Sequence, residues 1–190
     1  MPRKRGRYDK REVNAYGGAL QKSRQGRFCA RPIWPGYLMH LIFKSTHAEG
    51  AWSFRKPRNY QKIGQLIERF GEKHGVEIHD YAIHFNHVHM SVTPKSRTGY
   101  VRFIRALTSA VAMFVMKASR WASKTVKRFF DRRPYSRIAF TPPEEGVIDE
   151  YIQLNKLTAG GFTRAEARRF LAQESKKKSD RWKAEARRRP

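Results

Sequence analysis

The sequence predicts an α+β fold in which helices pack on one face of an antiparallel sheet. Two observations lead to this prediction. Apolar residues recur at helical spacing in some segments and in the short runs of strands in others. In chain order these segments form a strand, a helix, two strands, a helix, a strand and a helix, an order typical of a sheet covered by helices. With 190 residues and 39% hydrophobic side chains, the chain is long enough to bury one core.

The first predicted strand and helix lie in the first half of the chain. Residues 37–46 (YLMHLIFKST) have the apolar run of a buried strand. A helix follows and ends near Gly75, because its apolar residues recur at i, i+3, i+4 and i+7. This stripe consists of Ile63, Leu66, Ile67 and Phe70.

Two strands, residues 76–83 and 87–92, are predicted next, joined by a short turn at Phe85 and Asn86. Side chains alternate between the faces of a strand, so the second strand has one apolar face and one polar face. The apolar face carries Val88, Met90 and Val92, and the polar face carries His87, His89 and Ser91. Helices on one side would leave the histidine side of the sheet free for a site.

The second half of the chain predicts a helix, a strand and two further helices. A helix over residues 98–120 presents a stripe of Val101, Ile104, Val111, Val115 and Ala118. Residues 134–140 resemble a short strand. A helix then begins at an N-cap, Thr141, with Pro142 in its first turn and Glu144 completing a capping box, and it ends at residues 160–161. Thr163 and Glu166 repeat the capping-box spacing before a last basic helix.

The formal net charge of +25 indicates a polyanionic partner, most often nucleic acid. Positive charge gathers at both ends, so we expect a basic flexible arm at residues 1–27 and a basic helical tail at residues 162–190, on either side of a domain at residues 28–161. Further cations lie in the predicted helix of residues 98–120 and in the segment that follows it. The candidates for nucleic-acid contacts are Arg102, Arg105, Lys124, Arg128, Arg132 and Arg133.

The compartment is predicted from what the sequence lacks. The single cysteine, Cys29, excludes an internal disulfide and a multi-cysteine zinc site, which fits a reducing cytosol. No apolar stretch follows the basic N-terminus, so we expect no signal peptide. The most apolar run, residues 106–116, is far shorter than the roughly 20 residues that span a bilayer.

Four residues form a candidate site for chemistry on a phosphate. His87 and His89 lie on the same side of one strand, so their nitrogens can converge on one divalent ion. Tyr151 and Asn155 are four apart on one helix face, where Asn155 can give the ion an oxygen and Tyr151 can act as a nucleophile. The alternative is that both histidines and Tyr151 only pack. We interpret His84 and His79 as structural, turn or DNA-facing residues.

Two motifs make the sequence resemble a known family. NHVHMSV (residues 86–92) resembles the His-hydrophobe-His motif of the HUH endonucleases. EYIQLNKLTAGG (residues 150–161) is similar to the nucleophile helix of REP-associated tyrosine transposases, which are single-tyrosine transposases of the IS200-like class. The histidine strand precedes the tyrosine helix in both. The likeness covers about residues 30–161.

The resemblance implies a ferredoxin-like HUH fold and a DNA transposase or nickase. Such an enzyme cleaves single-stranded DNA, with Tyr151 bonded to the 5′ phosphate, and rejoins it in transposition and recombination. Carried over by position, His87, His89 and Asn155 would bind Mg²⁺ or Mn²⁺, and no nucleotide cofactor would be needed. The resemblance also implies single-stranded or hairpin DNA as partner, a possible homodimer and a bacterial, nucleoid-associated place in the cytoplasm.

The sequence departs from the family pattern at two places. Relatives often have Met-Pro before the asparagine of the histidine motif, where this chain has His84 and Phe85. They usually have Pro after the asparagine of the tyrosine helix, where this chain has Lys156. Neither departure removes a proposed catalytic group, but DNA preference could differ.

Other functions remain open from the sequence. One is an inactive HUH-like or RRM-like module that only binds nucleic acid, and another is a replication or mobilisation nickase with the same chemistry. His89 and Ser91 match one half of a two-histidine phosphoesterase, but no second half is present. The sequence also has no glycine-rich phosphate loop, which argues against ATP use.

Overall fold

The computed structural model describes residues 16–17, 32–118, 126, 128–131 and 133–187. Its strands form one antiparallel sheet in the order β1-β5-β2-β4-β3. The strands are β1 (Tyr16–Gly17), β2 (Met39–Lys44), β3 (Val76–Ile83), β4 (His87–Pro94) and β5 (Tyr135–Ile138). The helices are α1 (Pro57–His74), α2 (Arg97–Val115), α3 (Pro142–Ala159) and α4 (Arg164–Arg187), with one 3₁₀ turn at Gly50–Trp52. The predicted α+β class and the predicted order of elements are confirmed.

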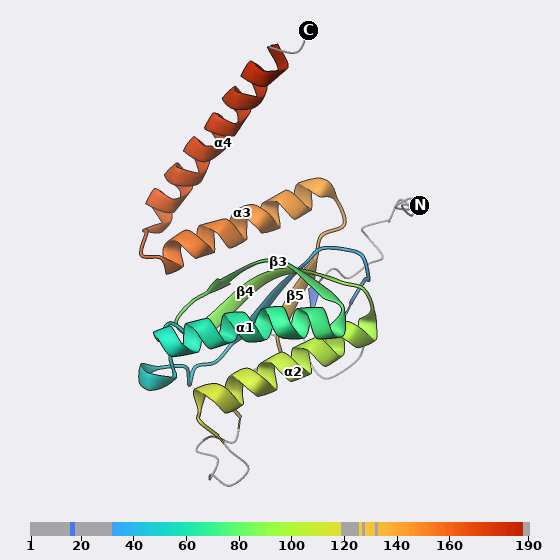
Figure 1. Cartoon of the computed structure of the whole chain (residues 1–190), viewed down its shortest axis with the longest axis vertical. Coiled ribbons are helices and arrows are strands. Elements are labelled where there is room, and N and C mark those ends of the chain that lie inside the picture. The colour runs from blue at the N-terminus through green and yellow to red at the C-terminus, as the bar shows by residue number, and fades with distance from the viewer. Residues whose placement is uncertain (1–15, 18–31, 119–125, 127, 132, 188–190) are drawn as a thin grey trace.

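The main core lies between the sheet and the α1–α2 layer. Val88, Met90 and Val92 of β4 are fully buried there, as the alternation predicts, against the predicted stripe of α1. α3 lies across the other face of the sheet (Figure 1) and contributes Ile148 and Ile152 to a second, smaller core. α3 therefore covers part of the histidine face of the sheet, which we expected from the sequence to be free.

The buried stripe of α2 differs from the predicted one. Val111 and Val115 are buried as expected, but Val101 and Ile104 are only half-buried. Because α2 has apolar residues on most of its sides, more than one stripe at helical spacing fits the sequence, and packing against the sheet decides which is buried. The other buried residues of α2 are Gly99, Tyr100, Phe103 and Leu107.

An irregularity in β3 sets which side chains of its second half face α3. The pairing with β4 shifts between Ile78 and Asp80, so that His79 is the extra residue of a bulge. Ile78 before the bulge and Ile83 after it both pack in the main core. Asp80 and Ala82 therefore alternate onto the α3 side of the sheet.

The helix ends follow the predicted signals. Gly75 ends α1 in the left-handed conformation, at φ 64°. At the start of α3, the Glu144 carboxylate accepts hydrogen bonds from the backbone N–H groups of Phe140 (2.8 Å) and Thr141 (3.2 Å). Glu166 accepts one from the N–H of Thr163 (2.8 Å) before α4.

The basic ends of the chain are described only in part. Tyr16 and Gly17 pair with Arg137 and Ser136 of β5, and the rest of the predicted arm lies outside the described residues. α4 extends away from the sheet beyond α3 (Figure 1). Among the described residues, no helix is both long enough and apolar enough to cross a membrane.

Replacing Gly99 with alanine tests the packing of α2 against the end of α1. A Cβ atom there would overlap with the backbone oxygen of His74, so we expect Gly99→Ala to destabilise the protein by about 1–3 kcal/mol in urea unfolding. Gly146→Ala is the matched control. Its Cβ meets nothing within 4 Å, and it should stabilise α3 by about 0.5–1 kcal/mol. Equal unfolding midpoints for Gly99→Ala and the wild type would contradict this packing.

Candidate functional site

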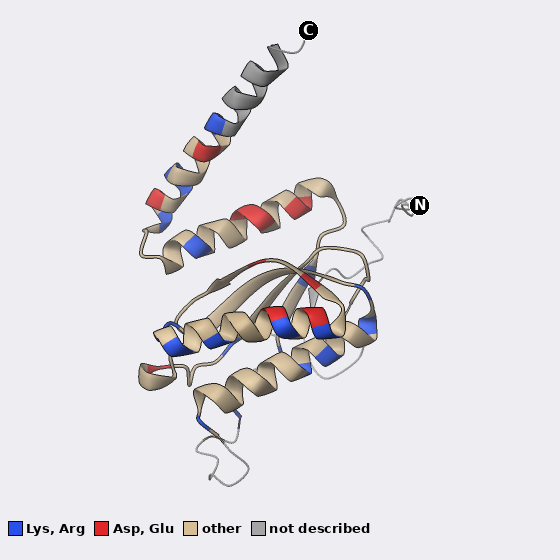
Figure 2. Cartoon of the chain, in the orientation of Figure 1, with Lys and Arg blue, Asp and Glu red and all other residues tan. Residues whose placement is uncertain are grey.

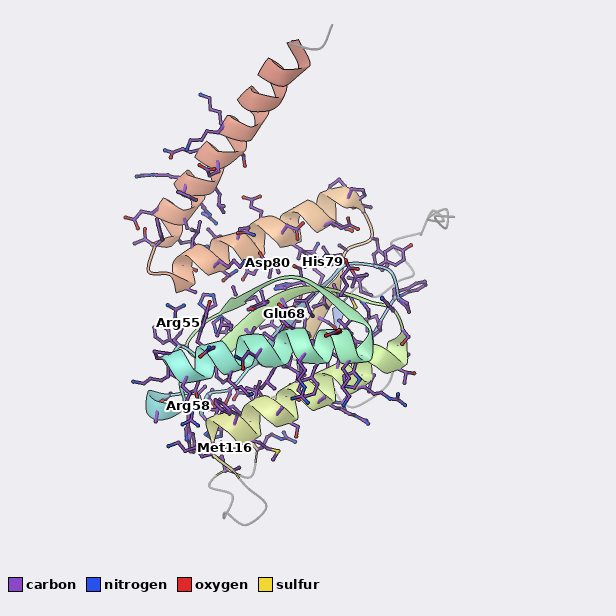
Figure 3. The ribbon with its side chains drawn as sticks, viewed as in Figure 1. Arg55, Arg58, Glu68, His79, Asp80 and Met116 are labelled. Atoms are coloured by element: carbon purple, nitrogen blue, oxygen red, sulfur yellow. The ribbon has the colours of Figure 1, made fainter. Side chains whose placement is uncertain are left out.

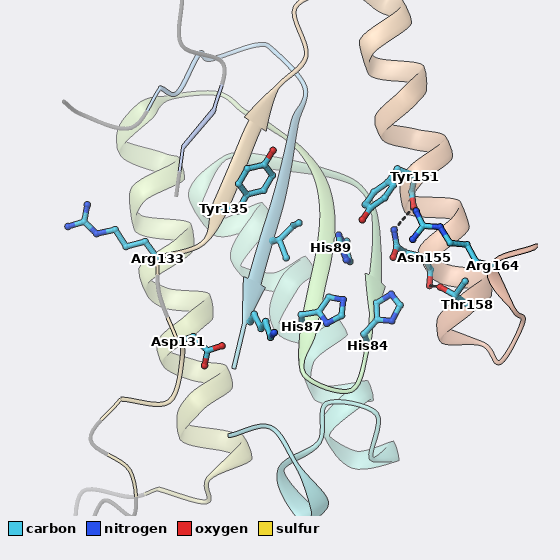
Figure 4. Close-up of a pocket in the computed structure, with 12 residues that line it drawn as sticks. His84, His87, His89, Asp131, Arg133, Tyr135, Tyr151, Asn155, Thr158 and Arg164 are labelled. Atoms are coloured by element: carbon cyan, nitrogen blue, oxygen red, sulfur yellow. Dashed lines mark hydrogen bonds between the residues drawn. The ribbon is translucent and has the colours of Figure 1, made fainter. Parts of the chain in front are cut away.

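A cavity of about 740 Å³ opens between α3 and the polar face of the sheet. Figure 4 shows side chains from both sides pointing into it. Its lining residues are Ile42, Lys44, His84, His87, His89, Asp131, Arg133, Tyr135, Tyr151, Asn155, Thr158 and Arg164. Four of these, His87, His89, Tyr151 and Asn155, are the residues that the sequence predicts for the site, so the fold brings all four together.

Three histidines form a cluster at one end of the cavity. One ring nitrogen from each of His84, His87 and His89 lies within 4.8 Å of the others. His84 follows β3 directly and faces His87 across the turn of the hairpin, where the backbone N–H of His84 donates to the carbonyl oxygen of His87 at 2.9 Å. Their rings stack with centroids 4.5 Å apart, and the His89 ring lies edge-on to His87 at 4.9 Å.

Hydrogen bonds on the far side of two rings orient this cluster. Nδ1 of His87 lies 2.9 Å from the amide oxygen of Asn86, an acceptor, so Nδ1 carries the proton and Nε2 carries a lone pair. Nδ1 of His89 shares a hydrogen bond with Nε2 of His40, at 3.1 Å, and when Nδ1 is the donor, Nε2 of His89 also carries a lone pair. In His84, Nε2 is buried and has no hydrogen-bond partner. In all three rings, Nε2 therefore takes part in none of these hydrogen bonds.

Burial keeps the cluster neutral at physiological pH. It lowers the pKa of His89 to about 2, with further lowering by His40, His87 and His84. It lowers the pKa of His87 to about 4, and the charges of His84 and Lys44 add to this. Burial also lowers the pKa of His84, against a smaller raising effect of the Asn155 side chain beside it. Neutral imidazole is the form that binds metal ions, so the donor set suits a divalent cation.

Tyr151 lies beside the cluster. Its ring centroid is 5.4 Å from that of His89 and 5.4 Å from that of the buried His40, in edge-to-face contact with both. Figure 4 shows it projecting from α3 towards His89. Asn155, one turn later on α3, donates from Nδ2 to the backbone oxygen of Tyr151 (2.6 Å), which turns its amide oxygen away from that carbonyl. A phenol and an amide oxygen thus share the cavity with the imidazoles.

Asp80 fastens α3 to the sheet. Its carboxylate accepts a hydrogen bond from Nε2 of Gln153 (2.6 Å) and forms an ion pair with Lys156. Figure 3 shows Asp80 on the side of the sheet that faces α3. Gln153 and Lys156 are on the same helix as Tyr151 and Asn155, so this contact helps to place both on the cavity. Lys156 stands where the resembled family usually has proline.

The predicted nucleic-acid residues do not all lie in one place. Arg133 lines the cavity, together with Lys44 and Arg164. Arg102 and Arg105 are exposed on α2, in the layer on the other side of the sheet, where Figure 2 shows Lys and Arg but no Asp or Glu along the helix. Arg128 is exposed. Lys124 and Arg132 lie outside the described residues.

Three other tyrosines are less well placed than Tyr151 to act as a nucleophile. Tyr100 is 2% exposed in the main core. Tyr81 packs on the α1 side of the sheet, and burial raises its pKa. Tyr135 does line the cavity, but it reaches the histidines through His40, with ring centroids 6.1 Å apart.

Three residues of the site were missed or interpreted differently from the sequence. The sequence suggests a structural, turn or DNA-facing role for His84, yet His84 lies in the cluster. The predicted two-residue turn implies that it faces His87. His40 alternates with the buried Met39 and Leu41, a pattern that places it on the histidine face. No sequence signal points to Arg164, because only the turn from α3 to α4 brings it to the cavity.

Residues 37–155 match the family described as IS200-like transposase. Among solved structures, the REP-associated tyrosine transposase bound to a REP hairpin shares 13% identity, with 72% of this chain and 75% of that chain covered and a TM-score of 0.49. A Deinococcus radiodurans R1 protein described as a transposase shares 14% identity over 70% of this chain and 97% of that chain, with a TM-score of 0.42. No curated protein matches the sequence.

Replacing Asp80 tests how α3 is held. We expect Asp80→Ala to lower the local stability of α3 by about 1 kcal/mol, because the two contacts of Asp80 with α3 are one hydrogen bond and one partly exposed ion pair. The carboxylate also accepts a hydrogen bond from the backbone N–H of Tyr81 (2.8 Å), which lies within β3. Backbone amides of α3 should then exchange with deuterium about fivefold faster, while those of α1 should not change. Glu77→Ala, at an exposed acid on the same strand, is the control. Unchanged exchange in α3 would show that Asp80 does not hold it.

Proposed function

Because this chain belongs to the IS200-like transposase family, we propose that it cleaves and rejoins single-stranded DNA through a covalent bond between Tyr151 and a 5′ phosphate. Membership in this family confirms the resemblance read from the two motifs and, with the structure, the predicted HUH fold. The observation that carries the proposal is the single cavity that holds Tyr151, Asn155 and the histidine cluster.

His87, His89 and Asn155 would hold a divalent ion, Mg²⁺ or Mn²⁺, as expected from the resemblance. Both histidines are neutral, and the hydrogen bonds at their Nδ1 atoms leave Nε2 for a metal ion. The amide oxygen of Asn155 is also a suitable ligand. When bound, the ion polarises the scissile phosphate and offsets the charge that develops on it.

The chain's own residues supply the nucleophile and its placement. The hydroxyl oxygen of Tyr151 attacks phosphorus, and the bond from phosphorus to the 3′ oxygen of the preceding nucleotide breaks. The phenolic proton passes to water, and the leaving 3′ oxygen takes a proton to become a hydroxyl. Attack by a 3′ hydroxyl on the phosphotyrosine reverses the step. The number of phosphate ester bonds is conserved, so rejoining needs no nucleotide.

Cations around the cavity support a DNA substrate. Lys44, Arg133 and Arg164 line the cavity and can neutralise phosphates next to the scissile one. Arg102 and Arg105 lie in the other layer, so we assign them to phosphates outside the cavity, as we do Arg128. Lys124 and Arg132 remain predictions.

The wider assignments remain proposals. The solved REP-associated transposase is described as bound to a REP hairpin, and a hairpin is a candidate partner for this chain too. We also propose a homodimer, a cytoplasmic, nucleoid-associated location, a catalytic domain at residues 28–161 and a basic helical tail after it.

The proposal is tested by the covalent adduct. Incubation of the protein with labelled single-stranded hairpin DNA and Mn²⁺ should give a protein–DNA band that survives SDS. We expect EDTA to abolish this band and Tyr151→Phe to remove it completely, because phenylalanine has no hydroxyl to attack phosphorus. Tyr135→Phe, a second tyrosine of the same cavity, is the matched control and should keep the band.

The rival function, an inactive nucleic-acid-binding module, predicts another result. The wild type would then retain the DNA at low salt and release it at high salt without any adduct. Tyr151→Phe would behave in the same way.

A further inference from the structure

His84 is a member of the histidine cluster that the proposed cleavage reaction does not use. Its ring stacks on that of His87, with planes 6° apart. Stacking alone would be satisfied by any flat side chain. It does not explain why a nitrogen of this ring is buried without a hydrogen-bond partner, which is rare for polar atoms inside proteins.

The three rings present the same nitrogen. Nδ1 of His87 is engaged by Asn86, and Nδ1 of His89 is engaged by His40, so the nitrogen left for a ligand is Nε2 in both. The unpartnered nitrogen of His84 is also Nε2. Such bonds to the far nitrogen fix the tautomer and the ring orientation of metal-binding histidines.

We propose that His84 binds the same ion as His87 and His89, and that this three-imidazole set selects a transition-metal ion over Mg²⁺. The inference rests on the metal site of the proposed function and narrows its cofactor. Mg²⁺ prefers six oxygen ligands and gives up its water reluctantly, whereas imidazole suits Mn²⁺ moderately and Co²⁺, Ni²⁺ and Zn²⁺ well.

The surroundings favour nitrogen over oxygen ligands. The cluster formed by the described residues contains three imidazoles and no carboxylate. The acidic residue that lines the cavity, Asp131, lies outside this cluster. Its Oδ1 accepts hydrogen bonds from the backbone N–H of Thr46 (2.7 Å) and from the Thr46 hydroxyl (2.9 Å). Asn155 can add one amide oxygen to the three nitrogens.

The spacing suits one shared ion. Metal–nitrogen bonds of about 2.0–2.1 Å keep two ligand atoms on one ion within about 4.2 Å of each other. The ligand atoms of the cluster lie within 4.8 Å, so a small rotation of the rings closes them around an ion.

The test measures metal affinity on the full chain without DNA. Isothermal titration should show Co²⁺ binding at least 100-fold tighter than Mg²⁺, and the visible absorption of bound Co²⁺ should report nitrogen ligands. We expect His84→Phe, which keeps a flat ring against His87, to weaken Co²⁺ binding at least 10-fold and to change Mg²⁺ binding less than threefold. His79→Phe is the matched control, because His79 lies on β3 outside the cluster, and it should bind Co²⁺ as the wild type does.

The outcomes separate this inference from the cleavage proposal. Equal Co²⁺ affinity in His84→Phe and the wild type, with the same absorption spectrum, overturns the role of His84. A wild type that binds Mg²⁺ as tightly as Co²⁺ overturns the selectivity. If metal binding follows our expectation but Tyr151 forms no adduct, the cleavage proposal fails and the inference stands. The far-UV circular dichroism of His84→Phe should match that of the wild type, so that a loss of Co²⁺ affinity reports on the site and not on folding.

Discussion

The packing of α3 against the polar face of the sheet is the constraint on which the site depends. The histidines belong to the β3–β4 hairpin, whereas Tyr151 and Asn155 come from a helix more than fifty residues later in the chain. Apolar contacts of Ile148 and Ile152 hold α3 down, and the Asp80 carboxylate binds Gln153 and Lys156. The bulge at His79 makes this possible, because it places Asp80 on the side that faces α3.

One departure from the family pattern lines the cavity, and the other lies on the helix that covers it. Lys156, where relatives usually have proline, forms an ion pair with Asp80 and so adds a contact between α3 and the sheet. Its backbone oxygen accepts a hydrogen bond from the N–H of Gly160 (2.9 Å) at the end of the helix. His84, where relatives often have methionine, brings a third imidazole to the cavity. This chain thus has both motifs of the resembled family, the histidine pair and the tyrosine helix, with different residues next to them.

Local patterns predicted the elements well, because periodicity and capping are properties of neighbouring residues. Glu144 lies at the start of α3 and Gly75 at the end of α1, as expected. The alternation of Val88 with His89 assigned the faces of β4 correctly. Patterns failed where tertiary packing decides. Which stripe of α2 is buried depends on which apolar side meets the sheet. Whether α3 covers the histidine face depends on contacts between segments far apart in the chain. His40 meets His89 only through the pairing of β2 with β4, which no local pattern specifies.

The most direct test of the account is the distance between Tyr151 and the bound ion in solution. Mn²⁺ broadens the NMR signals of nearby nuclei, and the effect falls steeply with distance. With ¹³C-labelled tyrosine and substoichiometric Mn²⁺, we expect the ring signals of Tyr151 to disappear first, while those of Tyr100, in the core on the other side of the sheet, remain. Persistence of the Tyr151 signals while Mn²⁺ is bound would contradict it.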